Sequence, residues 1–514
     1  MAFSFPELPA VMAGGPTGPM LMPVAFTIFF LWVLYKLLAP QRKITNASSG
    51  LPPGPPAWPI MGNMHQLGKL PYRDLRDLAK KYGPLMFLKL GSVPTVVVSS
   101  SDMAKEFLKT HDLVFANRPA STASKYVAYN EKNLSLAPYG DYWRHMRKVY
   151  VMELLSAKRT ESFRSVREEE VSVAVKSIWE KSQHGTVAVN VSESIASLIS
   201  SIIWRTLAGT KSSEDDDSVG KELNRMVHQV TSMIGAFNIG DFIPYIAWID
   251  ELSGVKGQMK KAHNFFDAVA EKIIVDHIEE SKNRGNQEQH KHTKDLVDVL
   301  LEMADNTTEM NFTREHIKAI VFDMMLGGLL TTISTEWAMN EMLRNPHVSQ
   351  KLQAEIESIV GKDHMVNESD LGHMEYLQCV VKETLRLYPP DPLMLPHESR
   401  EDCTVAGYFI PNKTNLIVNV WAIGRDPAVW EDPMTFKPER FIGNNIDIRG
   451  RDFKMLPFGA GRRGCPGAGL AMGKIEFVLA QLVHCFDWTI EGNDNPSDLD
   501  MTRKDNIFAV PTLK

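Results

Sequence analysis

Apolar side chains recur every three or four positions over long stretches of this chain, which is the spacing of one face of an α-helix. On this basis we predict helices over residues 156–181, 255–282, 296–305, 314–343 and 347–359, one beginning near residue 376 and one following residue 467. The β-branched run at residues 95–99 (TVVVS) indicates a short strand, and the polar run at residues 281–294 indicates a loop. The expected fold class is therefore mainly α with small β regions.

The most apolar segment lies close to the N-terminus, at residues 20–38. Its 19 residues are enough to span a bilayer as a helix. Glu7 precedes the segment and Arg42 and Lys43 follow it, so the positive-inside rule puts the remaining chain in the cytosol. A cleaved signal peptide is the alternative, but its basic charge would precede the apolar run. We therefore predict that residues 1–43 form a single-pass anchor in a lipid bilayer.

A proline-rich stretch comes after this segment, with the sequence LPPGPPAWP at residues 51–59. Proline fixes φ and removes a backbone donor, so this stretch is expected to be a stiff, extended hinge over residues 44–59. No strong linker and no internal repeat divides the remainder of the chain. Residues 60–514 are therefore predicted to be one large domain.

The net charge and the cysteine content of the chain exclude several classes of protein. The formal net charge of −6 lacks the basic excess of a nucleic-acid-binding protein, so no nucleic-acid partner is expected. The four cysteines, at positions 379, 403, 465 and 485, are too few and too widely spaced for a disulfide framework or a zinc cluster. This usage is typical of a reducing compartment and leaves single cysteines available for chemistry.

One of these cysteines lies in a glycine-rich run, PFGAGRRGCPG, at residues 457–467. Glycine admits positive φ and lets backbone approach a ligand closely, so such a loop can aim amide N–H groups at the Cys465 sulfur. These hydrogen bonds would tune a metal thiolate, and Arg463 could pair an anionic group. The alternative is a glycine-rich turn that holds an inert cysteine.

This run resembles the haem-binding signature of the cytochrome P-450 superfamily, F-x-x-G-x-R-x-C-x-G. The signature is read here, without departure, at Phe458, Gly461, Arg463, Cys465 and Gly467. The resemblance implies the cytochrome P-450 fold, here preceded by the N-terminal transmembrane helix. It also implies a haem b cofactor whose iron takes Cys465 as its axial thiolate ligand, with Phe458 and Arg463 binding the cofactor.

Two further segments carry the same resemblance and imply contacts to the haem. Trp143 and Arg147 match the family's W-x-x-x-R segment, in which both side chains contact a haem propionate. A guanidinium suits this role because it offers a planar fork of donors to a carboxylate. His397, in the sequence LPHES, is a further candidate for a propionate contact, although an isolated histidine is more often structural.

Charged residues elsewhere match the family's buried triad. Glu383 and Arg386 stand three positions apart and so share one helical face, and Arg440 belongs to the FKPERF segment. The resemblance implies that the three side chains meet behind the haem, with a structural role. The alternative for Glu383 and Arg386 is an exposed pair that contributes little to stability.

Several stretches look like those of plant microsomal members of the family. They are ANRP (116–119), NIGDFIP (238–244), KETLRLYPP (382–390) and AIGRDP (422–427). The resemblance implies an endoplasmic reticulum membrane location, with O₂ as co-substrate and electrons from a membrane-bound NADPH-cytochrome reductase. Arg144, Lys148 and Arg462 are candidate contacts for that reductase, although they could equally form an ordinary solvated face.

The predicted central helix departs from the family, which usually carries [A/G]-G-x-[D/E]-T-[T/S] there to relay protons during oxygen activation. In one register Gly328 and Thr331 match and Leu330 replaces the acid; in the other Leu329 replaces it. We take Thr331 and Thr332 as the candidate catalytic residues. Asp323 cannot serve as a substitute acid, since it lies about 80° around the helix and about 12 Å back from Thr331.

The resulting hypothesis is a haem-thiolate monooxygenase that hydroxylates a small apolar plant specialised metabolite, with a terpenoid as first choice and a phenylpropanoid or flavonoid as second. Segments 115–137, 233–249, 391–395 and 507–510 and the central helix are expected to line an apolar pocket. One alternative is a haem-thiolate enzyme that rearranges or dehydrates a pre-oxidised substrate without NADPH. The other is a non-catalytic haem-binding protein on the same membrane.

Overall fold

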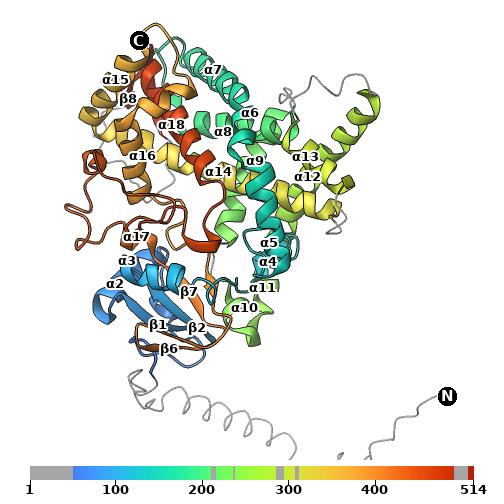
Figure 1. Ribbon diagram of the computed structural model, residues 1–514, viewed down its shortest axis with the longest axis vertical. Helices are drawn as coiled ribbons and strands as arrows, with labels where there is room; N and C mark the ends of the chain where they lie inside the picture. The colour runs from blue at the N-terminus through green and yellow to red at the C-terminus, as the bar shows by residue number, and fades with distance from the viewer. Residues whose placement is uncertain are drawn as a thin grey trace, which may run out of the picture.

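Helices make up most of the chain in the computed structural model, which describes residues 50–209, 216–234, 238–284, 294–306, 312–490 and 507–513 (Figure 1). The longer helices are α2 (Pro71–Tyr82), α5 (Asp141–Lys148), α7 (Arg164–Lys181), α8 (Val191–Ala208), α9 (Asp216–Ile234), α12 (Val255–Arg284), α13 (Leu296–Asn306), α14 (Arg314–Arg344), α15 (Pro346–Val360), α16 (Glu375–Leu387) and α18 (Ala468–Cys485). The shorter ones are α3 (Ser101–Lys105), α4 (Thr122–Tyr126), α6 (Ala157–Ser162), α10 (Ile239–Phe242), α11 (Ile249–Leu252) and α17 (Val420–Ile423). Single 3₁₀ or π turns are η2 (Met64–Gln66), η3 (Glu106–Thr110), η4 (Val149–Leu154), η5 (Pro244–Ile246), η6 (Glu368–His373), η7 (Pro438–Phe441) and η8 (Gly461–Arg463).

In the described part of the chain, three small sheets complete the fold and confirm its predicted class, mainly α with small β regions. The largest has the order β1 (Leu85–Leu90), β2 (Val93–Val98), β7 (Asn415–Val418), β4 (His397–Glu398), and only its β2–β7 pair is parallel. The second has the order β3 (Val189–Asn190), β9 (Phe508–Leu513), β8 (Phe486–Ile490), and the third pairs β5 (Cys403–Val405) with β6 (Tyr408–Ile410). The strand predicted at 95–99 is β2, and Figure 1 shows its sheet at one end of the molecule, below the helices.

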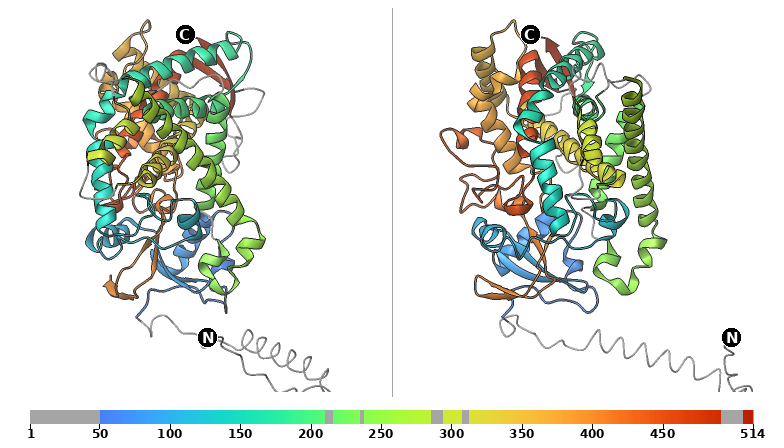
Figure 2. Two further views of the ribbon diagram at one scale, coloured as in Figure 1. Left: turned by 90° about the vertical axis from the view of Figure 1, so that its right-hand side faces the viewer. Right: turned by 45° about the vertical axis from the view of Figure 1, so that its right-hand side comes forward.

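The long helix α14 forms the centre of the helical part. It packs against α8, α16 and α18 in the helical part of the molecule (Figure 2). Most of its side chains are buried. Within the described residues, α14 and α18 are long and apolar enough to cross a membrane, but 56% and 61% of their apolar windows are buried inside the protein. Both are therefore core helices, as the wide apolar faces predicted for residues 314–343 and after 467 require.

The predicted helix boundaries agree with the structure except at residues 156–181. There the chain forms two helices, α6 and α7, separated at Phe163. The side chain of Phe163 is 5% exposed and belongs to the main core, and its ψ of 10° departs from helical geometry. Helical periodicity alone does not reveal this break, because Phe163 keeps the apolar spacing while its backbone leaves the helix.

The predicted membrane anchor, residues 1–43, lies outside the described residues, as does the first part of the predicted hinge. The division into anchor, hinge and catalytic domain therefore stays a prediction. All four cysteines are free, in agreement with the expectation that the chain forms no disulfide framework.

Candidate functional site

The glycine-rich loop around Cys465 has a backbone that only glycine adopts readily. Gly459 and Gly461 have φ of +69° and +66°. A Cβ on Gly461 would lie 2.4 Å from the carbonyl oxygen of Leu108, so the position needs glycine on steric grounds as well. The Cys465 N–H donates to the Phe458 carbonyl at 2.8 Å, which closes the loop and fixes the cysteine backbone.

The Cys465 sulfur lies just before α18, which begins at Ala468. The N–H of Gly467 donates a hydrogen bond to this sulfur, and Arg147 lies close enough to favour its thiolate form. Burial nevertheless raises the pKa of Cys465. The sulfur-bearing side chain still keeps exposed surface, so it is accessible to a ligand. A sulfur with an amide donor, a nearby cation and a helix N-terminus is suited to bind a metal as thiolate.

Arg463 crosses from this loop to the segment after Phe115. It donates to the carbonyls of Ala116 and Ala137, both at 2.7 Å, and its guanidinium lies over the Trp143 ring at 4.6 Å. Burial and then the nearby Arg118 and Arg147 lower the pKa of Arg463 to about 8. This buried cation is therefore surrounded by like charges and carbonyls.

Arg118 and His397 extend this basic group on the side of β4. Arg118 donates to the Ser135, Leu395 and Pro396 carbonyls, and burial lowers its pKa to about 10. The Nδ1 of His397 bonds the Phe115 carbonyl at 2.8 Å, whereas its buried Nε2 has no partner among the described residues. Burial, Arg118 and Arg463 hold the pKa of His397 well below its usual range.

We call Arg118, Arg147, Arg463 and His397 the basic cluster. Among the described residues, Asp391 beside Arg118 is the one carboxyl group that acts appreciably on the cluster. Buried charges require partners, so the cluster suits an added anionic group. Haem b is a flat macrocycle with two propionates and an iron that accepts a thiolate. A basic cluster next to Cys465 therefore fits this cofactor.

The structure brings together most of the site residues expected from the sequence. Arg147 and Arg463 lie near Cys465, Trp143 lies under Arg463, and Phe458 packs against the main core. The indole N–H of Trp143 donates to the Leu134 carbonyl at 3.2 Å and so is not free in this structure. Arg118 was missed, although it lies in the ANRP stretch at residues 116–119, which offered the available signal.

The two candidate catalytic threonines lie on α14 and are buried. The Thr331 hydroxyl donates to the Gly328 carbonyl at 2.7 Å, and the buried Thr332 hydroxyl has no partner among the described residues. Gly327 is exposed in the middle of this largely buried helix, so it marks a face of α14 that other elements do not cover. Leu330 and Thr331 lie about 60° and 40° from Gly327 around the helix, whereas Leu329 lies on the opposite side and is buried. This geometry favours the register in which Leu330 stands at the position of the family's acid.

Asp323 does not replace that acid. Its carboxylate accepts hydrogen bonds from the Leu134 N–H, the Ser135 hydroxyl and Tyr150 at 2.7, 2.9 and 3.0 Å. The side chain is therefore fully engaged with neighbouring elements. This agrees with the expectation, from helical geometry, that it cannot serve the relay.

The predicted charge triad is present and buried. The Glu383 carboxylate accepts from Arg386 Nε at 2.7 Å and from Arg440 Nε at 3.0 Å. Arg386 also donates to the carbonyls of Gly424 and Pro433. The alternative of an exposed pair is therefore wrong.

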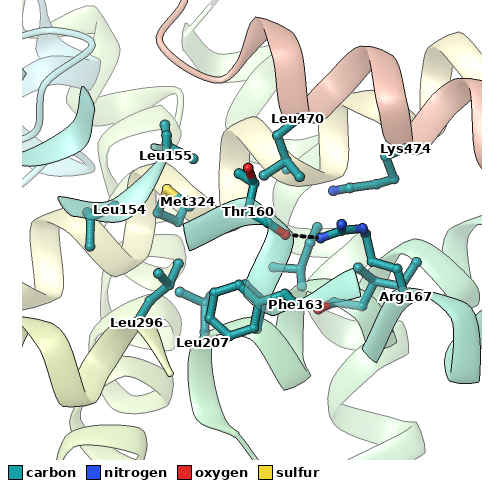
Figure 3. Close-up of a pocket in the computed structure, with 14 residues that line it drawn as sticks. Leu154, Leu155, Thr160, Phe163, Arg167, Leu207, Leu296, Met324, Leu470 and Lys474 are labelled. Carbon is teal, nitrogen blue, oxygen red and sulfur yellow. Dashed lines mark hydrogen bonds between the residues drawn. The ribbon is translucent and has the colours of Figure 1, made fainter. Parts of the chain in front are cut away.

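A separate small cavity of about 40 Å³ lies between α7, α8, α14 and α18 (Figure 3). It is lined mainly by apolar residues, and the ends of two cationic side chains, Arg167 and Lys474, lie near each other at its edge. Arg167 forms an ion pair with Glu368, whereas no partner of the Lys474 amine is found among the described residues. Burial and the nearby Arg167 lower the pKa of Lys474 to about 8.

Comparison with known proteins identifies the class to which this fold and site belong. A sequence model of the family "Cytochrome P450" matches residues 52–513, so the chain belongs to the cytochrome P450 family. It is 53% identical to cytochrome P450 750A1 of Pinus taeda, over 96% of each chain, and 41% identical to strychnine-11-hydroxylase of Strychnos nux-vomica, over 94% of each. A zebrafish cytochrome P450 structure with progesterone shares the fold, with a TM-score of 0.71 and 22% identity over 86% of this chain and 99% of that one.

The family defines what kind of enzyme this is. The chain is an oxidoreductase of the plant cytochrome P450 monooxygenases, whose cofactor is haem held by a cysteine thiolate. Such enzymes use O₂ and electrons from a partner reductase. The expectation of a haem-dependent monooxygenase is therefore confirmed.

Proposed function

We propose that Cys465 is the axial thiolate and that the enzyme hydroxylates a small apolar plant specialised metabolite at the membrane of the endoplasmic reticulum. The observation that carries this assignment is the Cys465 sulfur, which accepts the Gly467 N–H beside the basic cluster. The haem supplies the activation of O₂ when it is bound. The polypeptide supplies the sulfur ligand, the counter-charges and the shaped, apolar surroundings.

The basic cluster would bind the propionates of the haem. Arg147 has no hydrogen bond or ion pair with another described residue, and its guanidinium is free to make a bidentate contact with a carboxylate. His397 offers its unpartnered Nε2. An anion beside these groups would raise the pKa of His397, so that Nε2 carries a proton and donates.

Proton delivery depends on Thr331 and Thr332, because the acid expected between Gly328 and Thr331 is absent. The Thr331 hydroxyl donates its hydrogen bond to the Gly328 carbonyl, and its oxygen can accept one from water or substrate. Thr332 has an unpartnered hydroxyl. Leu330 makes this part of α14 more apolar, which suits a terpenoid first and a phenylpropanoid or flavonoid second. A substrate hydroxyl or ordered water would then complete the path for protons.

Membrane contact is supported by a second feature, an exposed apolar patch. The patch consists of Trp58, Ile60, Tyr245, Trp248 and Leu252, which are 59–87% exposed. Its two segments are adjacent, because Gly91 N–H donates to the Met61 carbonyl and Ser92 N–H donates to the Phe242 carbonyl. Exposed aromatic residues of this kind prefer the interface between water and lipid.

Electrons would come from NADPH-cytochrome reductase, which would bind near the cysteine loop. Of the three candidate contacts, Arg144 pairs with Asp141 and Arg462 pairs with Asp112, whereas Lys148 is exposed. The surface formed by these three residues therefore has less unpaired positive charge than the sequence indicates. A partner with carboxylates could still exchange with these exposed pairs at low free-energy cost.

The test is to measure product formed per NADPH consumed, with reconstituted reductase and a panel of plant terpenoids and phenylpropanoids. We expect Thr331→Ala to lower this ratio. Leu330→Asp is expected to raise it, unless a substrate hydroxyl already fills the role or the buried carboxyl stays protonated. Coupling that neither substitution changes would contradict the proposed path for protons.

The alternative, rearrangement of a pre-oxidised substrate, is favoured by one observation, the loss of the acid at Leu330. Such an enzyme needs no electrons. Product that forms at the full rate without NADPH and reductase would support this alternative and overturn the hydroxylase proposal.

A further inference from the structure

Asp323 is a partly buried acid on α14 whose side-chain contacts all leave its own helix. Its Oδ1 accepts from Asn133 Nδ2 at 2.8 Å and from the Ser135 hydroxyl at 2.9 Å. Its Oδ2 accepts from the Leu134 N–H at 2.7 Å and the Tyr150 hydroxyl at 3.0 Å, with the Ser135 N–H at 3.4 Å. The Leu134 and Ser135 N–H groups and the Asn133 amide donate to it, which favours the ionised carboxylate, while desolvation raises the pKa of Asp323.

The segment bonded to Asp323, residues 133–135, also accepts hydrogen bonds from two arginines of the basic cluster. The Leu134 carbonyl accepts from Trp143 Nε1 at 3.2 Å and from Arg463 Nη1 at 3.4 Å. The Ser135 carbonyl accepts from Arg118 Nε at 3.0 Å. The same two residues thus give their N–H groups to Asp323 and their carbonyls to the two arginines. The peptide unit between Leu134 and Ser135 therefore joins the carboxylate, through the Ser135 N–H, to the Arg463 guanidinium, through the Leu134 carbonyl.

A third connection runs through Tyr150. This residue belongs to η4, which directly continues α5, the helix that carries Trp143 and Arg147. The Tyr150 side chain is 3% exposed, and its hydroxyl donates to Asp323. Asp323 therefore fixes two elements relative to α14, the segment at residues 133–135 and the end of the helix that carries Arg147.

We propose that Asp323 is a positioning residue of the haem site, which aligns Arg118, Arg147 and Arg463 toward the anionic edge of the cofactor by holding the segment Asn133–Ser135 and Tyr150. Its negative charge also balances part of the basic cluster through the intervening peptide dipoles. The inference rests on the proposed role of the basic cluster, but it concerns a residue about 140 positions from the cysteine motif.

The test compares the rate of haem transfer from the purified holoenzyme to excess apomyoglobin. Asp323→Asn keeps the size of the side chain but puts an amide N–H₂ against backbone N–H donors. Loss of a residue that orients a cofactor's ligands typically costs 10–100-fold in affinity. We therefore expect haem transfer to be roughly 10–100-fold faster, while the reduced carbon monoxide adduct keeps the spectrum of a thiolate ligand.

Glu341→Gln is the matched control. Glu341 is a buried acid of α14, with hydrogen bonds from Tyr388, Asn345 and Arg344, none of which belongs to the held segment. Its loss should lower the melting temperature as Asp323→Asn does, yet leave haem transfer within about twofold of the wild type. Equal acceleration in both variants would show that Asp323 acts through general stability and would overturn the proposal.

A second pair of variants keeps the test decisive if Asp323→Asn does not fold. Tyr150→Phe and Ser135→Ala each remove one donor to Asp323 and retain the fold's packing. We expect each to accelerate haem transfer severalfold and the double variant to accelerate it further. Wild-type rates in all of these would refute the positioning role. A wild-type protein without a thiolate spectrum would instead contradict the assignment of Cys465, so the two failures are distinguishable.

Discussion

At the scale of single residues, the most unusual group outside the haem site is the buried amine of Lys474. It is 4% exposed, lies near Arg167 and lines a cavity whose wall is mainly apolar. Both desolvation and like charge disfavour its protonated form, so this residue is expected to destabilise the folded enzyme at neutral pH.

The pH dependence of stability tests this directly. The folded pKa of Lys474, about 8, lies below its ordinary value of 10.5, so the unfolded chain binds more protons between these two pH values. The destabilisation is present in full below pH 8 and disappears as the pH rises toward 10.5. Lys474→Met should therefore raise the free energy of unfolding at pH 7 by up to about 3 kcal/mol, with a gain that shrinks through this range.

Chemical unfolding of the wild-type and Lys474→Met holoenzymes measures how far the substitution changes the free energy of unfolding at pH 7 and at pH 10. Lys176→Met, at an exposed position of α7, is the control and should change stability by less than about 0.5 kcal/mol. A gain for Lys474→Met that is the same at both pH values would show that packing, and not charge, decides its effect.

At the scale of elements, the sequence predicts those parts of the site whose residues lie close together along the chain. Residues 457–467 form one loop before one helix, and Trp143 and Arg147 share one turn, so motif and geometry coincide. Partners far apart in sequence could not be predicted. Asp323 meets Leu134 across 189 positions and Arg118 meets Leu395 across 277, and neither pairing leaves a periodic signal.

The triad shows how helix α16 is joined to η7. Glu383 is fully buried and receives two guanidinium groups, from Arg386 and Arg440. Glu383→Gln leaves both cations with a weaker partner, so we expect a loss of about 3–5 kcal/mol in the free energy of unfolding. Glu180→Gln, whose wild-type side chain pairs with the exposed Lys176, is the control and should cost less than about 1 kcal/mol. Equal losses in urea unfolding would contradict the structural role of the triad.

At the scale of the whole molecule, the exposed apolar patch predicts how the enzyme sits on a membrane. Deletion of residues 1–43 should release the protein from vesicles only in part, because the patch around Trp248 and Tyr245 keeps some affinity for lipid. Adding Tyr245→Ser and Trp248→Ser should remove most of this residual binding in a flotation assay. Met434→Ser, at another exposed apolar position, is the control and should leave the residual binding unchanged. Full release by the deletion alone would contradict a role for the patch.

The fold class and the family could be predicted from the chain, since long amphipathic helices and an unbroken cysteine motif have few competing interpretations. The break at Phe163 and the burial of Lys474 could not, because each depends on packing between helices that are distant in sequence. The loss of the acid at Leu330 was visible in the sequence. The exposed Gly327 and the buried Leu329, which the sequence does not reveal, favour one of its two registers.

The central claim is that Cys465 provides the sulfur that binds the haem iron. The most direct measurement is the absorption spectrum of the dithionite-reduced, carbon monoxide-bound holoenzyme. The wild type should show the red-shifted Soret band that marks a thiolate ligand and gives the family its name, and Cys485→Ala should keep it. Cys465→Ala should lose that band even when haem is present. A Cys465→Ala protein that still shows the thiolate band would contradict the account.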